Sequence, residues 1–160
     1  MNKAIFLDRD GVVNREIGYV SKVEDLELLP DTLDALKFFR EKGYLLIIIT
    51  NQGGVAKGMY SIETLNLIHG KMLDEFAKHK IDIAEVYYCP HHSQIGRCLC
   101  RKPDSLMIEK ALARFEIDPK RSYFIGDHER DIEAGKKAGI KTILMKSNGS
   151  LLNVSKELIF

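Results

Sequence analysis

The sequence lacks a strong charge of either sign, a long hydrophobic run and a leader-like first segment. Its 24 basic and 23 acidic residues leave a net charge of +1, which gives no reason to expect a nucleic-acid-binding or membrane-binding surface. The longest apolar run, residues 44–49, is far too short to cross a lipid bilayer. Since the first residues also lack the hydrophobic region of a signal peptide, we expect a cytoplasmic protein with neither nucleic-acid nor membrane partners.

Cysteine is scarce, and its arrangement argues against an ordinary disulfide framework. Cys89, Cys98 and Cys100 are the only three, and an odd number so close together is a poor basis for disulfide pairing. With a histidine they form Cys-x-His followed by Cys-x-Cys, which supplies the four ligands of a closed structural zinc site. The spacing leaves His91 and His92 as competing fourth ligands. We therefore expect a loop stapled by zinc.

The composition itself is typical of a globular domain. The chain has 160 residues, of which 45% are apolar and 29% are charged, and this is enough for one sizeable core. No internal repeat, low-complexity tract or linker divides it, so we predict a single domain over residues 1–160. No exposed apolar stripe is evident in the sequence, and we therefore expect a monomer.

Short apolar runs alternate with helical patterns along the whole chain. The predicted strands are residues 3–7, 44–49, 84–88, 122–125 and 140–145. Helices are predicted from Asp31 to about residue 42, over some eighteen residues after Ser61, from Asp104, over residues 131–138, and weakly in the last fifteen residues. This alternation predicts an α/β fold, namely a Rossmann-like doubly wound parallel sheet with flanking helices. No insertion is large enough to form a cap domain.

The second of these helices carries an apolar stripe and two histidines. The stripe consists of Leu65, Ile68, Met72, Leu73 and Phe76. We expect the two histidines, His69 and His79, to be solvated rather than functional.

Two aspartates end the first predicted strand. Asp8 and Asp10 directly follow a run of four apolar residues, where a buried strand has no structural use for carboxylates. In open α/β sheets, ligands bind at the carboxyl ends of the strands. Two acidic groups so close repel each other unless a cation or a shared proton neutralises them. The pair therefore predicts a magnesium site, with one carboxylate left to carry out chemistry.

Polar residues also follow three other predicted strands. These are Thr50 and Asn51 after the second, Arg101 and Lys102 after the loop of the third, and Asp127 after the fourth. Parallel connectivity brings all these ends to one edge of the sheet. Carboxylates there can hold magnesium or attack phosphorus, and lysine, hydroxyl and cation can neutralise charge on a transferring phosphoryl group. The ensemble predicts phosphoryl transfer.

These segments resemble the four motifs of the haloacid dehalogenase superfamily of phosphohydrolases. The matching segments are Asp8-Arg9-Asp10-Gly11, Thr50-Asn51, Lys102, and Gly126-Asp127 followed by Asp131. The resemblance covers essentially the whole chain and implies an aspartyl-phosphate mechanism, with Asp8 as nucleophile and Asp10 as general acid and base. It also implies magnesium ligands from Asp8, from the main-chain carbonyl of Asp10 and from Asp127. Thr50 and Lys102 would stabilise the phosphoryl group, and Asp131 would support the site.

The cysteine loop resembles that of two zinc-bearing branches, the D-glycero-D-manno-heptose 1,7-bisphosphate 7-phosphatases and the histidinol-phosphate phosphatases. The pattern Cys-x-His…Cys-x-Cys-Arg-Lys-Pro in these branches selects His91 over His92 as the zinc ligand. Most segments look more like the heptose branch, but the short zinc loop keeps the histidinol branch open. Carried over by position, the substrate contacts would be Glu16, Gly18, Tyr19, Asn51, Gln52, Gly53, Lys57 and Arg101. The expected substrate is a small phosphorylated metabolite, and the role of His128 beside Asp127 stays open.

Overall fold

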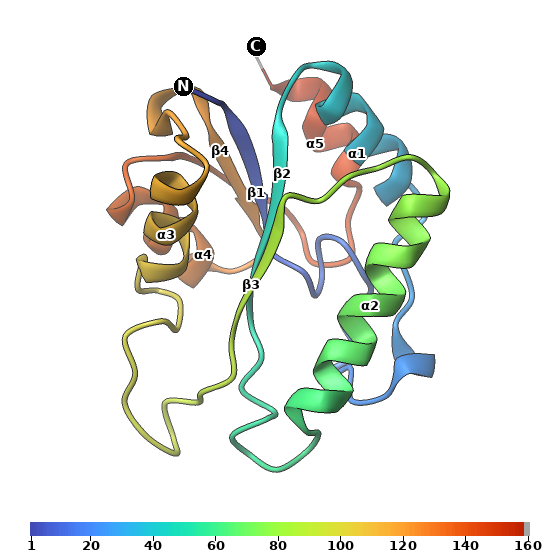
Figure 1. Cartoon of the computed structure of the whole chain (residues 1–160), viewed down its shortest axis with the longest axis vertical. Helices are drawn as coiled ribbons and strands as arrows, with labels where there is room; N and C mark the ends of the chain where they lie inside the picture. Colours follow the sequence, from blue (N-terminus) through green and yellow to red (C-terminus); the bar gives the residue numbers. More distant parts are fainter. Residues whose placement is uncertain (159–160) are drawn as a thin grey trace.

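The computed structural model describes residues 1–158 and has one parallel sheet in the strand order β3-β2-β1-β4-β5. The strands are β1 (Ala4–Leu7), β2 (Leu45–Asn51), β3 (Glu85–Cys89), β4 (Tyr123–Gly126) and β5 (Lys141–Leu144). Every paired neighbour runs parallel, with Phe6 opposite both Ile47 and Phe124. This order leaves β1 at the centre of the sheet, so its carboxyl end lies between those of β2 and β4 (Figure 1).

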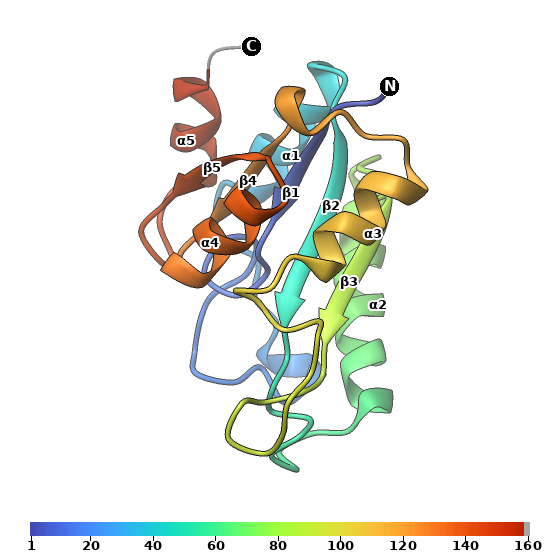
Figure 2. The same ribbon diagram turned by 90° about the vertical axis from the view of Figure 1, so that its left-hand side faces the viewer.

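Helices cover both faces of the sheet. They are α1 (Thr32–Glu41), α2 (Ile62–Lys78), α3 (Leu106–Arg114), α4 (Glu129–Lys137) and α5 (Leu151–Glu157). Helices α1, α2 and α5 lie on one face, and α3 and α4 lie on the other (Figures 1 and 2). The predicted doubly wound α/β architecture is therefore confirmed.

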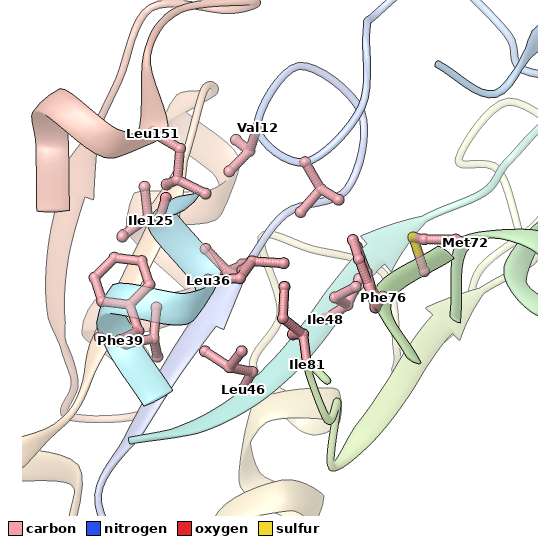
Figure 3. Close-up of a cluster of buried hydrophobic side chains, with 14 of the residues drawn as sticks. Val12, Leu36, Phe39, Leu46, Ile48, Met72, Phe76, Ile81, Ile125 and Leu151 are labelled. Atoms are coloured by element: carbon pink, nitrogen blue, oxygen red, sulfur yellow. The ribbon is translucent and has the colours of Figure 1, made fainter. Parts of the chain in front are cut away.

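The alternation of side chains along the strands divides the core into two clusters. Ile5, Leu46 and Ile48 point to the face where Leu36 of α1 and Phe76 of α2 pack (Figure 3). Phe6 and Ile47 point to the opposite face, where Ile108 and Ala111 of α3 and Ala134 of α4 pack. Because both faces are buried, the strands read as continuous apolar runs rather than alternating ones.

Three predicted helix starts are informative. Ser61 caps α2 as predicted, since its Oγ accepts a hydrogen bond from Thr64 N at 3.1 Å. Asp31 is the N-cap residue of α1 as predicted, although its carboxylate accepts a hydrogen bond from Ser150 Oγ before α5 and does not bond to the first turn of the helix. The predicted start of α3 at Asp104 is wrong, because the helix begins at Leu106 and Asp104 lies 3.5 Å from Lys137 Nζ of α4.

Helix α4 begins two residues earlier than residue 131, where the sequence pattern placed its start. It runs from Glu129, and the Asp131 carboxylate accepts a hydrogen bond at 3.1 Å from the main-chain nitrogen of His128, the N-cap residue. Asp131 is therefore the third residue of the helix rather than the first, and its side chain points back toward the strand ends.

The loops at the carboxyl edge of the sheet contain little regular structure. Between β1 and α1 the described chain forms one 3-10 helix, Val23–Asp25, and isolated bridges. The β2–α2 loop and the β3–α3 loop extend below the sheet beside each other (Figure 2), and Ala56 N of the first donates to Pro90 O of the second at 3.1 Å. Among residues 1–158, no helix combines the length and apolarity needed to cross a membrane.

Candidate active site

Lys102 is a buried cation at the centre of the strand ends. Only 1% of Lys102 is exposed, and its Nζ lies 2.9 Å from Asp8 Oδ1, 2.7 Å from Asp131 Oδ1 and 2.7 Å from Ile49 O. Asp8 follows β1, Ile49 belongs to β2 and Asp131 to α4, so three separate segments meet on one ammonium group. The main chain of Lys102 is fixed as well, because Asn51 exchanges two side-chain hydrogen bonds with its N–H and C=O groups at 3.0 and 3.1 Å.

The charges around Asp8 do not balance. Burial raises the pKa of Asp8 well above its ordinary value, Lys102 opposes this rise, and Asp131 and Asp127 add to it. Burial also acts to lower the pKa of Lys102, but Asp8 and Asp131 raise it overall, so Lys102 stays protonated. Three carboxylates around one ammonium leave an excess of negative charge at neutral pH, which a divalent cation would offset.

Asp127 also has a carboxylate oxygen that is available to a cation. Its Oδ1 lies 2.8 Å from His128 Nδ1, while its Oδ2 is buried without a hydrogen-bond partner among the described residues. A Cβ atom on Gly11 would lie 2.2 Å from that same Oδ2, so the glycine leaves the space beside it free. Buried polar atoms are normally paired, and hard oxygen ligands are those that magnesium prefers.

The donor set around this position fits a divalent metal. One ligand atom from each of Asp8, Asp127, His128 and Asp131 lies within 4.8 Å of the others. Asp131 is already paired with Lys102. The two side chains best placed to hold the ion are therefore those of Asp8 and Asp127. The Asp10 carboxylate is not in this group, which is compatible with its predicted metal contact through the main-chain carbonyl.

The Asp10 carboxylate instead belongs to a second buried polar cluster. Its Oδ1 accepts hydrogen bonds from Arg9 Nη2 at 2.8 Å, Arg9 Nε at 3.2 Å and Asn14 Nδ2 at 2.9 Å. Its Oδ2 accepts one from Gln52 Nε2 at 2.9 Å. Burial acts to raise the pKa of Asp10, but Arg9, Asn14 and Gln52 together lower it below its usual value.

His69 belongs to the same cluster, and the prediction that it is solvated is wrong. It is only 6% exposed, its ring packs against Tyr88 with centroids 5.7 Å apart, and its Nε2 lies 3.1 Å from Arg9 Nη1. Because a guanidinium can only donate, His69 Nε2 is the acceptor, and the ring is neutral. Its helical spacing of four residues after Leu65 and three before Met72 places it on the apolar stripe, a signal that the sequence carried.

His69 should make the stability of the protein depend on pH. Burial and the nearby Arg9 lower the pKa of His69 to about 3. As the pH falls below about 6.5, the unfolded chain takes up a proton on this residue while the folded chain does not, so protons favour unfolding. We expect the free energy of unfolding to fall by up to about 1.4 kcal/mol per pH unit from this residue alone.

Chemical denaturation of wild type and His69→Gln between pH 7 and 5 measures this contribution. The difference in unfolding free energy between the two proteins should shrink as the pH falls. A difference that stays constant across this range would contradict a neutral, buried His69. His79→Gln, which changes an exposed histidine on the same helix, is the matched control and should leave the pH dependence unchanged.

A pocket of about 240 Å³ opens over Asp8 and Asp10. Seven of the eight predicted substrate contacts line it, namely Glu16, Gly18, Tyr19, Asn51, Gln52, Gly53 and Arg101. The exception is Lys57, which is exposed and whose Nζ donates to Tyr19 Oη at 3.0 Å. Thr50 lies beneath the pocket, where its Oγ1 accepts from Gln52 Nε2 at 2.9 Å.

One wall of the pocket is cationic. Arg101 and Arg130 line it together with His92, and Arg101 Nη1 donates to His91 O at 3.0 Å. Partial burial and the positive charges of Lys57, Arg101 and Arg130 lower the pKa of His92. Gly53 permits this packing, since a Cβ there would lie 2.7 Å from His92 Cδ2. The sequence reasoning missed Arg130 and Tyr60 as pocket residues, because neither belongs to a recognisable motif.

Glu16 also lines the pocket. Its Oε1 accepts from Gly18 N at 2.6 Å, and burial together with the charge of Asp10 raises the pKa of Glu16. Arg15, a nearby cation in the same loop, does not line the pocket and pairs with Glu27 at 3.1 Å.

The cysteines gather beside the pocket with one imidazole. Ligand atoms of Cys89, His91, Cys98 and Cys100 all lie within 4.8 Å of one another, and four pairs of them are 2.7 to 3.7 Å apart. Tetrahedral zinc with Zn–S near 2.3 Å places its ligand atoms about 3.5–3.8 Å apart, so this set is close to a zinc site. His92 lies outside the set and its Nδ1 accepts from Gln94 N at 3.1 Å.

Comparisons with known proteins all identify phosphatases or related hydrolases as similar to this chain. A family model described as HAD-hydrolase-like matches residues 99–152. The D-glycero-alpha-D-manno-heptose-1,7-bisphosphate 7-phosphatase of Campylobacter jejuni subsp. jejuni is 43% identical over 143 residues, which cover 89% of this chain and 81% of that protein. The D-glycero-beta-D-manno-heptose-1,7-bisphosphate 7-phosphatase of Haemophilus influenzae is 38% identical over 155 residues, covering 93% and 84%. The crystal structure of a D,D-heptose 1,7-bisphosphate phosphatase from B. bronchiseptica, complexed with magnesium and phosphate, matches with a TM-score of 0.89 at 30% identity and covers 97% of each chain.

Proposed function

Because this chain belongs to the D-glycero-D-manno-heptose-1,7-bisphosphate 7-phosphatase family of haloacid dehalogenase-like hydrolases, we propose that it removes the phosphate at carbon 7 of that bisphosphate. The chain is a phosphatase that hydrolyses phosphate esters. The observation that carries the proposal is the meeting of Asp8, Lys102 and the unpaired Asp127 oxygen beneath a pocket with a cationic wall.

The first half of the proposed reaction is performed by Asp8. Its carboxylate attacks phosphorus, the bond from phosphorus to the sugar oxygen breaks, and an aspartyl-phosphate forms on Asp8. Lys102 keeps the carboxylate oriented through its 2.9 Å contact with Oδ1 and, with the Thr50 hydroxyl, offsets charge on the phosphoryl oxygens. Magnesium held by Asp8, Asp127 and the main-chain carbonyl of Asp10 would withdraw further charge from those oxygens.

Asp10 acts as the general acid in the first half of the proposed reaction and as the general base in the second half. It gives a proton to the departing sugar oxygen and then removes one from the water that hydrolyses the aspartyl-phosphate. Its location in the wall of the pocket, two residues after Asp8, supports this role. The pocket is open to solvent, which lets water reach phosphorus once the sugar has left.

The cationic wall supports a substrate with two phosphates. A second phosphate needs positive charge away from the nucleophile, and Arg101 and Arg130 provide it on one side of the pocket. Histidinol phosphate is itself cationic and gains less from that wall. Glu16 is the one pocket feature that favours histidinol phosphate, because its carboxylate could pair with an ammonium group. Histidinol phosphate is therefore assayed as the second substrate.

We further propose that Cys89, His91, Cys98 and Cys100 hold a structural zinc ion. The spacing of their ligand atoms supports this, as does the position of Cys100 two residues before Lys102. A monomer working in the cytoplasm is part of the same proposal.

A comparison of substrates with added magnesium tests the proposed function. We expect kcat/KM for the heptose bisphosphate, assayed as both anomers because the relatives are named for either one, to exceed that for histidinol phosphate by at least about 100-fold. The organic product should keep its carbon 1 phosphate. Equal or greater activity on histidinol phosphate would overturn the substrate assignment.

Arg130→Ala serves as the matched probe of the second phosphate. It should raise KM for the bisphosphate about tenfold or more, because a charge-assisted contact is lost, and should change KM for heptose 7-phosphate far less. Arg121→Ala, which changes an exposed arginine before β4 at the opposite edge of the sheet, should affect neither substrate. Equal effects of Arg130→Ala on both substrates would contradict a phosphate contact.

A further inference from the structure

The Asp10 carboxylate is fixed by donors on both of its oxygens. Oδ1 accepts three N–H groups, two from Arg9 and one from Asn14, whereas Oδ2 accepts only one, from Gln52. A carboxylate oxygen has room for about that many partners, so Oδ1 is saturated. Oδ2 is therefore the oxygen that can still exchange a proton with a group in the pocket.

Each of the two main donors is held in turn by a buried side chain. Arg9 is 0% exposed, and its remaining terminal nitrogen, Nη1, donates to Nε2 of His69 at 3.1 Å. Gln52 is 3% exposed, and its Oε1 accepts from Tyr60 Oη at 2.6 Å. The Asp10 carboxylate, which can only accept, selects the NH₂ end of the Gln52 amide, and the tyrosine hydroxyl holds the oxygen end in place.

We propose that His69 and Tyr60 are positioning residues that act through Arg9 and Gln52 to keep Asp10 Oδ2 turned toward the reacting ester oxygen. The inference rests on the proposed function, in which Asp10 is the general acid and base. Without His69, a buried Arg9 N–H lacks its acceptor and the guanidinium can rotate. Without the Tyr60 hydroxyl, the oxygen of the Gln52 amide loses its hydrogen-bond partner, and the amide can rotate away from the carboxylate. Either change leaves Asp8, Lys102 and Asp127 in place.

Two classes of ester separate a positioning role from a purely structural one. The alkoxide released from a sugar phosphate is a poor leaving group and needs the proton from Asp10. The phenolate released from p-nitrophenyl phosphate leaves without it. Because kcat/KM covers the steps up to departure of the leaving group, a misplaced Asp10 lowers this constant for the sugar ester and spares the aryl ester. General acid catalysis contributes about 10²–10⁴-fold to the rate, so even a partial displacement of Asp10 should lower kcat/KM measurably.

The test uses His69→Leu, His69→Gln and Tyr60→Phe, with His79→Leu on the exposed face of α2 as the matched control. We expect His69→Leu and Tyr60→Phe to lower kcat/KM for the heptose bisphosphate by about tenfold or more, and for p-nitrophenyl phosphate by less than about threefold. His69→Gln, which restores an acceptor for Arg9, should recover most of the loss. His79→Leu should match wild type on both esters.

A fall of equal size on both esters, or no fall on either, would overturn the inference. If His69→Leu does not fold, as judged by thermal unfolding, Tyr60→Phe decides the question, because it removes only the hydroxyl group and keeps the size of the side chain. A wild-type protein that hydrolyses neither ester with added magnesium defeats the proposed function, and this inference with it. That result is distinct from an active wild type whose variants fail the comparison.

Discussion

Asp8→Asn is expected to lower kcat by about 10³-fold or more while leaving the fold intact. An amide cannot attack phosphorus, and the loss of a nucleophile removes the reaction path rather than weakening one contact. The same change removes one of three clustered carboxylates, and burial together with Asp131 and Asp127 already raises the pKa of Asp8. We therefore expect the metal-free variant to be at least as stable as wild type at pH 7.

The sign of this stability effect follows from the proton balance. A carboxyl whose folded pKa is raised favours the folded state at low pH, and this contribution is lost as the pH rises above its ordinary pKa. At pH 7 an ionised Asp8 therefore works against the metal-free fold, and asparagine removes that penalty. Magnesium should raise the Tm of wild type more than that of Asp8→Asn, because only wild type offers both side-chain ligands.

Steady-state kinetics and thermal unfolding, each with and without magnesium, check both expectations. Asp34→Asn, an exposed aspartate in the first turn of α1, is the matched control and should leave kcat and the effect of magnesium unchanged. Activity of Asp8→Asn within about tenfold of wild type would contradict the assignment of the nucleophile.

Loss of zinc is expected to cause the second large effect. We expect purified protein to contain about one zinc per chain, and a structural zinc contributes on the order of 10–16 kcal/mol of apparent binding free energy, less the cost of ordering the loop. Much of the β3–α3 loop is exposed, as at Ile95 and Leu99, so apolar packing cannot replace the metal. Removal of zinc should release the loop and misplace Arg101 and Lys102, which follow Cys100 directly.

His91→Ala and His92→Ala form a matched pair for this prediction. The two imidazoles are neighbours in sequence, but only His91 lies among the cysteine sulfurs. His91→Ala should lose zinc and fall in Tm and kcat together, whereas His92→Ala should keep its zinc and change mainly KM, because His92 lines the pocket. Zinc content by elemental analysis decides the matter, and a wild type without zinc, or a His92→Ala without it, would contradict the proposed ligand set.

The catalytic edge could be predicted from the sequence because it depends on local patterns. Each apolar run ends where polar residues begin, and parallel connectivity then brings Asp8, Thr50 and Asp127 to the same edge. The cysteine spacing likewise indicated its own cluster. In both cases the polar or metal-binding residues follow a recognisable strand within a few positions along the chain.

The support around Asp10 could not be predicted in the same way. His69 lies 60 residues from Arg9, and their contact exists only because α2 packs over the face of the sheet, where the His69 ring lies against Tyr88 of β3. Arg130 enters the pocket because α4 begins two residues earlier than the pattern of its apolar residues suggests. Asp31 is a similar case, since the competing donor Ser150 is far away in sequence and brought near only by the fold.

The most direct test of the central claim, that Asp8 attacks phosphorus, is the stereochemical course of hydrolysis of an ester with an isotopically chiral phosphate. Transfer first to Asp8 and then to water involves two in-line displacements, so the account predicts retention of configuration at phosphorus. Inversion would mean that water attacks the ester directly, and would contradict the account.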